Sequence, residues 1–260
     1  MSTSKPLPRV LAVSQARRVT PHMIRVTFAG PELEGVPPGR EGANCKLMLP
    51  EAGETRGDFI ARLAEGPAPV RRTYTVRHHR PERLEMDIDF VDHGEGGPAS
   101  AWARAASPGA FLGFAGPGPV KVKSFHADFY VVAADMSALP VAAATLEAMP
   151  REARGIAVFE VTSLDDVQSI DAPEGVEMRW LVHEDPHRAS MAQLDLLRGL
   201  DWPPGRVQAC VAGEHSTIRA FRTWLLTEKG LRKDDAYISG YWKIGLIEDA
   251  HQDLKRSEAA

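Results

Sequence analysis

The spacing of apolar runs changes near residue 124, and this change most limits the folds open to the chain. Before it, short alternating runs such as RLEMDIDF, residues 83–90, are separated by Gly and Pro turns. Such runs predict an antiparallel β-barrel over residues 1–123. After it, apolar runs such as DFYVVAAD alternate with helical segments at 137–149, 190–199 and 216–229. That alternation predicts a second domain over 124–260, an α/β domain with a parallel sheet.

Two helical segments have distinct sequence signals. In the segment 216–229, Ser216 is expected to cap the helix start, and Gly230 follows the expected end. The apolar residues that share one face of this helix are Ile218, Phe221 and Leu225. A shorter helix is expected inside the barrel half, at PASAWARAAS.

Composition excludes several classes of protein. The net charge of −4 argues against a general nucleic-acid binder, and no run approaches the roughly 20 apolar residues of a membrane span. The start MSTSKPLPRV has no apolar leader region, so we expect a cytoplasmic protein with no membrane association. Cys45 and Cys210 lack partners at metal-ligand spacing, so we expect no metal site and two buried thiols.

The stretch VRRTYTVR, residues 70–77, reads as a strand with no plainly apolar face. Such a strand lies at a wet edge of a sheet or faces a ligand. Surface strands often carry Arg and Thr, which is the simpler interpretation. The alternative is a phosphorylated aromatic cofactor, because Arg offers a planar fork for phosphate, Tyr a flat ring and Thr a hydroxyl.

A second stretch, DFVDHGEGGPASAWA, residues 89–103, has the composition of an anion-binding helix start. Gly96 and Gly97 let the backbone approach a ligand, and Pro98 suits the first helical turn. The free amides that follow attract an anion such as a pyrophosphate. An ordinary Gly-Pro helix entry, with His93 as a loop histidine, explains the same residues.

Five stretches, in order along nearly the whole chain, resemble the siderophore-interacting protein family. These proteins are FAD-dependent ferric-siderophore reductases within the ferredoxin reductase-like group. The sequence departs from the family pattern at Ala134, Met136 and Ser137, where Gly, Glu and Thr are usual, and at Gly118, where Arg is often found. The stretches that carry the resemblance are RRTYTVR, HGEGGPASAWA, AADMSALPVAAATLEAMP, AGEHSTIRAFRTWLLTEKG and SGYWKIGLIEDAH.

The resemblance implies a two-domain, ferredoxin reductase-like fold with FAD bound at the barrel. It implies that the flavin carries the chemistry, so no catalytic side chain and no metal ligand is expected. Tyr74 would lie along the isoalloxazine ring, Thr75 near its reactive nitrogen, and Arg72 against phosphate. The full set of implied cofactor-binding residues is Arg72, Tyr74, Thr75, Arg77, Asp89, His93, Gly97, Pro98, Ala99, Ser100, Asp135, Ser137 and Trp242.

The resemblance also implies a substrate site and an electron donor. Lys46 and Lys243 match positions where the family places basic residues, and Lys121 or Lys123 could replace the one missing at Gly118. The expected partner is a ferric siderophore, and the expected state is a monomer. The expected donor is NADPH or NADH. Because no Gly-x-Gly-x-x-Gly fingerprint is present, a reduced ferredoxin is the alternative donor.

Two other functions are compatible with the same residues. One is a general NAD(P)H-flavin or ferredoxin reductase with another electron acceptor, and the other is a siderophore carrier without enzymatic activity. A carrier would purify colourless, whereas either reductase would be yellow.

Overall fold

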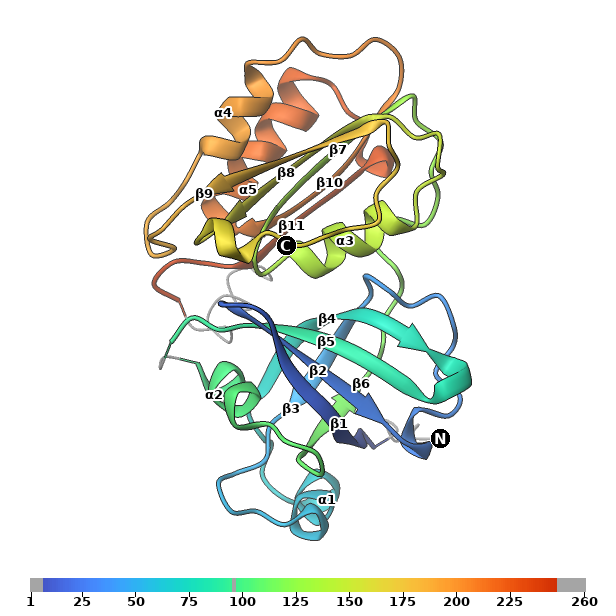
Figure 1. Ribbon diagram of the computed structural model, residues 1–260, viewed down its shortest axis with the longest axis vertical. Coiled ribbons are helices and arrows are strands. Elements are labelled where there is room, and N and C mark those ends of the chain that lie inside the picture. Colours follow the sequence, from blue (N-terminus) through green and yellow to red (C-terminus); the bar gives the residue numbers. More distant parts are fainter. Residues whose placement is uncertain (1–6, 95–96, 247–260) are drawn as a thin grey trace. The chain divides into compact units, whose positions relative to one another are not determined.

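The computed structural model describes residues 7–94 and 97–246, which fall into two compact units divided between Val120 and Lys121 (Figure 1). The expected boundary lay three residues later, after residue 123. Each unit has its own hydrophobic clusters, so each has a core of its own.

The first unit is a closed antiparallel barrel with the strand order β1-β2-β5-β4-β3-β6. This confirms the barrel that the alternating runs predict. Apolar side chains from all six strands fill its interior, as expected for a small barrel. The strands are β1 Arg9–Thr20, β2 Met23–Ala29, β3 Asn44–Met48, β4 Arg71–Arg80, β5 Glu85–Val91 and β6 Phe111–Ala115.

Strand β5 shows how the barrel buries polar residues. Met86, Ile88 and Phe90 have no exposed surface, as their alternation predicts. The intervening Asp87 and Asp89 are only 4% and 5% exposed, although the sequence pattern predicts a solvated face. They are buried because arginines on neighbouring strands pair with them, which satisfies charges that burial would otherwise make costly.

Two helices accompany the barrel strands. The helix α2, Pro98–Ala105, is the one expected at PASAWARAAS. The helix α1, Arg56–Glu65, was not predicted, because Phe59 is its only buried residue and its apolar face is weak. Phe59 packs with Val10 and Met48 in a small cluster separate from the barrel interior. Single-turn 3₁₀ segments occur at Pro31–Leu33 and Pro81–Arg83.

The second unit is a five-stranded parallel sheet, as predicted, and its strand order is β11-β10-β7-β8-β9. One cluster packs the helix α3, Leu139–Glu147, against one face of the sheet. A second cluster packs α4, Ala192–Arg198, and α5, His215–Arg222, against the other face (Figure 1). The strands are β7 Phe129–Asp135, β8 Gly155–Val161, β9 Val176–Val182, β10 Val207–Glu214 and β11 Ala236–Trp242.

The last predicted helix is correct in place but wrong in its cap. Ser216 lies inside α5, and the N-cap is Glu214, whose carboxylate accepts from the backbone N–H groups of Ser216 at 2.6 Å and Thr217 at 3.2 Å. Glu214 reaches both amides because its side chain is long enough to fold back over the first turn. After α5 the chain continues as a π-helix, Thr223–Glu228, and Gly230 follows with φ +68°.

Both cysteines are buried and unpaired, as predicted. Burial raises the pKa of Cys45 to about 12 and that of Cys210 to about 11. Within residues 7–94 and 97–246, no cluster of three or more His, Cys, Asp or Glu side chains is arranged to hold a metal ion. None of the helices in those ranges combines the length and the apolar character needed to cross a bilayer.

Candidate functional site

Strand β4, which holds RRTYTVR, lies between β3 and β5 inside the closed barrel. It therefore has no wet edge, and that explanation of its composition is excluded. The Tyr74 ring lies 4.4 Å from the Phe90 ring, and Val76 is fully buried, so this face of the strand packs on the barrel interior. Because side chains alternate along a strand, Thr73 and Thr75 face outward.

The outward residues of β4 pair with polar residues of β3. Lys46 stands opposite Thr73 and donates a hydrogen bond from Nζ to the threonine hydroxyl oxygen. Asn44 stands opposite Thr75, which is only 4% exposed. The side-chain oxygen of Asn44 is shielded from solvent and has no hydrogen-bond partner among the described residues.

Arg77 and Asp89, two of the predicted cofactor residues, lie in a buried ionic group. Asp89 forms two hydrogen bonds with Arg25, at 2.6 Å to Nε and 2.7 Å to Nη2. Arg77 lies 4.0 Å from Asp89 and is 4% exposed. These contacts join β2, β5 and β4, so Arg77 and Asp89 help to fix the position of β4. Direct contact of either residue with a cofactor stays a prediction.

Asp87 anchors the neighbouring part of the same barrel surface. Its carboxylate accepts hydrogen bonds from Thr27 at 2.8 Å and from Arg80 at 2.8 and 2.9 Å, and it contacts His78 Nδ1 at 2.9 Å. Burial alone would raise the pKa of Asp87, but these hydrogen bonds hold it well below its usual range. The group was not identified from the sequence, since the partners come from separate strands.

The start of α2 holds the second set of predicted residues. A Cβ atom on Gly97 would lie 2.5 Å from Cε1 of His93, so glycine is required for the imidazole to lie over this turn. Gly97 is the N-cap, Pro98 opens the helix and no side chain caps it. Gly97 has no side chain to cap the first amides of α2, and no side-chain cap hydrogen bond is present at this helix start among the described residues. Gly96, the other glycine of the predicted turn, lies outside the described residues.

The Ser100 hydroxyl lies in a buried polar group, and its contact with a cofactor stays a prediction. Its Oγ donates to Asp92 at 3.2 Å and accepts from Arg104 at 3.1 Å, and the residue is 2% exposed. Asp92 also binds Arg18 at 2.6 Å and Arg104 at 2.7 Å. Burial would raise the pKa of Asp92, but the two arginines lower it to about 2. The Ser100 hydroxyl thus bonds α2 to Asp92, the residue that follows β5, while Ala99 packs on the barrel core.

In the second unit, three predicted residues meet at the carboxyl end of β7. Asp135 accepts from the Ser137 amide at 2.9 Å, from the Ser137 hydroxyl at 2.5 Å and from Trp242 Nε1 at 2.7 Å. Burial raises the pKa of Asp135. A Cβ atom on Gly213 would lie 2.7 Å from this carboxylate, so the neighbouring strand approaches it closely.

Glu214 and Glu160 lie at the same edge of the sheet. Glu160 accepts from the Ser190 hydroxyl at 2.6 Å, and burial raises its pKa. Glu214 is occupied as the cap of α5, whereas Arg219, in the same helix, is exposed. The carboxyl edge of a parallel sheet is where α/β domains bind ligands.

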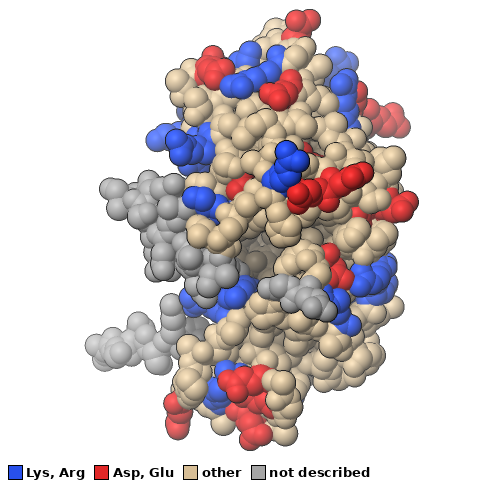
Figure 2. Space-filling model, turned by 90° about the vertical axis from the view of Figure 1, so that its left-hand side faces the viewer, with Lys and Arg blue, Asp and Glu red and all other residues tan. Residues whose placement is uncertain are grey.

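The predicted substrate lysines are divided between the two units. Lys46 belongs to the barrel, whereas Lys121 and Lys243 belong to the second unit. Lys121 lies over the Tyr237 ring at 5.9 Å, and burial lowers its pKa. Lys123 is exposed and Lys243 is half-buried. On the face drawn in Figure 2, basic and acidic side chains are interspersed.

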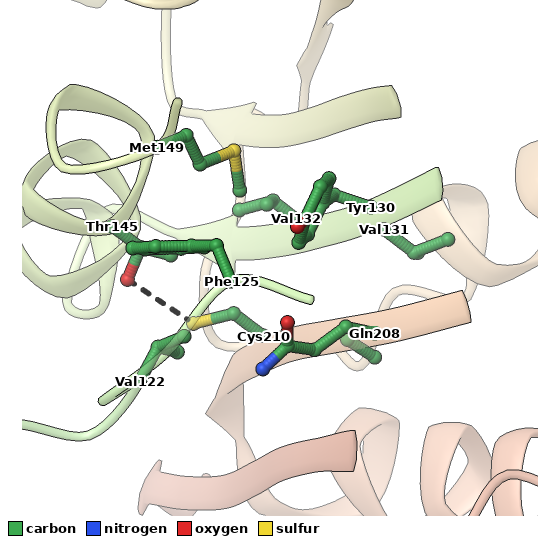
Figure 3. A pocket seen from close by; sticks show the side chains of 10 residues that line it. Val122, Phe125, Tyr130, Val131, Val132, Thr145, Met149, Gln208 and Cys210 are labelled. Carbon is green, nitrogen blue, oxygen red and sulfur yellow. Dashed lines mark hydrogen bonds between the residues drawn. The ribbon is translucent and has the colours of Figure 1, made fainter. Parts of the chain in front are cut away.

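A pocket inside the second unit is too small to be a ligand site. Its volume is about 10 Å³, which suits a single water molecule. Figure 3 shows Cys210 directed toward Thr145, with 3.6 Å between sulfur and hydroxyl oxygen. The remaining lining is largely apolar, so this pocket is a packing defect of the core.

Comparison with known proteins matches both halves of the chain. Residues 12–121 match the siderophore-interacting FAD-binding domain, and residues 127–245 match the siderophore-interacting protein domain. The ferric vibriobactin reductase ViuB of Vibrio cholerae is 36% identical over 255 residues, which cover 95% of this chain and 93% of that protein.

Two solved structures resemble the whole chain. The siderophore-interacting protein SipS from Aeromonas hydrophila superimposes with a TM-score of 0.85 at 33% identity, covering 97% of this chain and 98% of that one. A siderophore utilization protein from T. fusca gives a TM-score of 0.80 at 36% identity, covering 94% and 95%.

Proposed function

The chain belongs to the siderophore-interacting protein family of flavin-dependent oxidoreductases, and we propose that it reduces ferric siderophores with FAD as its redox cofactor. The observation that carries this proposal is the position of β4. Its hydrogen-bonding residues lie on a strand with neighbours on both sides, so a wet edge does not account for them. A ligand on the barrel surface is our explanation, since Thr75 and Arg77 are only 4% exposed and so are not the solvated residues of an ordinary surface strand.

The residues present fit FAD. Thr75 and the unpartnered Asn44 oxygen offer hydrogen-bonding groups side by side, and the uncapped start of α2 offers amides for phosphate. In this proposal Thr75 holds the flavin from the outward face of β4, and Arg72 and Tyr74, which lie on the opposite face but are only partly buried, contribute their exposed parts. His93 and residues 97–100 hold the pyrophosphate. Bound FAD accepts electrons in pairs and passes them on singly, which is the chemistry that the protein side chains cannot supply.

The chain's own residues then have two further tasks. The buried pair of Arg25 and Asp89 keeps β4 in place, and the Ser100–Asp92–Arg104 group keeps the helix start in place. Lys46, Lys121 and Lys243 are proposed to attract anionic ferric chelates without touching the metal. Ferrous iron matches hard oxygen ligands less well than ferric iron does. Reduction of the ferric iron therefore weakens its binding to the chelator.

The electron donor is proposed to be NADPH, NADH or a reduced ferredoxin. Asp135, Ser137 and Trp242, at the carboxyl edge of the sheet in the second unit, are proposed to bind a cofactor. The ferredoxin partner, the monomeric state and the cytoplasmic location stay predictions.

An anaerobic turnover assay tests the proposal. Purified protein is mixed with each donor and a ferric siderophore, and a ferrous-specific chelator reports the product. We expect a yellow protein whose iron reduction depends on bound flavin. A colourless protein that binds the siderophore supports the carrier, and a flavin that the donor reduces but no ferric chelate reoxidises supports the general reductase.

A further inference from the structure

Two neighbouring rungs of the β3–β4 pair carry polar side chains on the same outward face. Each rung joins one residue of β3 to the residue directly opposite on β4. The rung of Lys46 and Thr73 is closed by its own hydrogen bond. The next rung on this face, Asn44 and Thr75, is open, because the Asn44 side-chain oxygen accepts no hydrogen bond from any described residue.

The open rung is held in place on both sides. The backbone oxygen of Asn44 accepts a hydrogen bond from the Gly118 amide at 2.8 Å, and its strand pairs with β4. Only the side-chain oxygen is left without a hydrogen bond among the described residues. Thr75 stands directly opposite, but among the described residues no hydrogen bond joins its hydroxyl to the Asn44 side-chain oxygen.

A carbonyl oxygen in this state needs a donor from elsewhere. Less than 1 Å² of it is exposed, so bulk water does not satisfy it, and a buried acceptor without a partner costs free energy. A ligand that bonds it must replace the atoms that cover it now. The site offers a fixed acceptor beside a hydroxyl that can donate or accept.

This combination fits the polar edge of a flavin ring, where an imide N–H lies between two carbonyl groups. We propose that Asn44 is a flavin-binding residue, whose Oδ1 accepts a hydrogen bond from the imide N–H of the isoalloxazine ring. Thr75 bonds the adjoining part of the same edge. The inference rests on the proposed function, since it requires that FAD binds this face of the barrel.

The test compares FAD with 3-methyl-FAD, in which the imide N–H is replaced by N–CH₃. Apo-protein is titrated with each, and flavin fluorescence gives the two dissociation constants. For the wild-type chain we expect the methylated cofactor to bind roughly 10-fold more weakly. In Asn44→Leu the affinity for FAD should fall roughly 3- to 10-fold, which is the effect of one neutral hydrogen bond, and the preference for FAD should largely disappear.

Asn44→Asp keeps an acceptor oxygen and should keep a preference for FAD. The matched control is Thr73→Val on the closed rung, which should leave the preference unchanged. Thermal unfolding of each apo-protein separates loss of binding from loss of fold. If Asn44→Leu does not fold, Asn44→Ala, which also removes the acceptor oxygen, takes its place with the same expected loss of preference.

Three results overturn the inference. A wild-type protein that binds both cofactors equally, or an Asn44→Leu variant that keeps the full wild-type preference, removes Asn44 from the flavin site and leaves the proposed function intact. A wild-type protein that binds neither cofactor overturns the proposed function as well.

Discussion

The buried carboxylates of the barrel and those of the parallel sheet have different partners. In the barrel, Asp87 and Asp92 are bonded by arginines, and their pKa values are lowered. At the carboxyl edge of the sheet, Asp135 and Glu160 are bonded by hydroxyl, amide and indole groups, and burial raises their pKa values. Ionised carboxylates therefore stabilise the barrel, whereas ionisation of the carboxyl groups at the edge of the sheet is unfavourable.

This difference predicts opposite responses to pH. The Asp92 contribution is present above the usual carboxyl pKa of 3.8 and is lost as the pH falls through about 2. The Glu160 contribution is present below its usual pKa of 4.5 and is lost as the pH rises through its raised folded value. Acid weakens the first region, and neutral or alkaline pH weakens the second.

The largest expected effect comes from breaking a buried pair in the barrel. Arg25→Leu leaves Asp89 buried with Arg77 at 4.0 Å, so we expect a loss of about 3–5 kcal/mol in the free energy of unfolding. Denaturant titration measures it. The control is Arg151→Leu in the second unit, which removes an exposed ion pair and should change stability by about 1 kcal/mol or less. Equal small losses would contradict the contrast between the regions.

A smaller effect is expected at the edge of the sheet. Glu160→Gln keeps an acceptor for the Ser190 hydroxyl and removes the charge that burial disfavours. The variant should gain stability relative to the wild-type chain as the pH rises from 4.5 to 8. Unfolding curves across that interval check this. A variant that loses stability equally at every pH would show that Glu160 is held by a favourable charge interaction instead.

The smallest effect concerns His79, which is 7% exposed in the barrel. Burial lowers its pKa, although Glu41 and Glu82 oppose this. Its contribution should be complete above about pH 6.5 and decline as the pH falls toward the lowered folded value. His79→Leu should flatten the stability profile between pH 5 and 7. An unchanged slope would mean that His79 is not buried as the neutral form.

Strand alternation and helix periodicity were enough to predict both domains, since these patterns depend on neighbours along the chain. They did not predict α1, whose single buried residue is Phe59. The cap of α5 was also missed: Ser216 is the commoner cap residue, but the helix begins before it, at His215, and Glu214 caps the amides of Ser216 and Thr217.

The site could be predicted only in part for the same reason. The motif on β4 and the start of α2 are local, so the sequence identifies them. The role proposed for Asn44 has no local signal, because it depends on the β3–β4 register, which places Asn44 opposite Thr75, 31 residues later in the chain. The ion pairs that Asp87 and Asp89 form with arginines likewise depend on which strands become neighbours.

The central claim is that the barrel binds FAD through β4, and titration of the apo-protein with FAD after Arg72→Ala tests it most directly. Loss of a charge-assisted contact should raise the dissociation constant roughly 10- to 150-fold. Arg188→Ala, which removes an exposed arginine of the second unit, should leave it unchanged. Equal FAD affinity in the wild-type chain and both variants would contradict the claim.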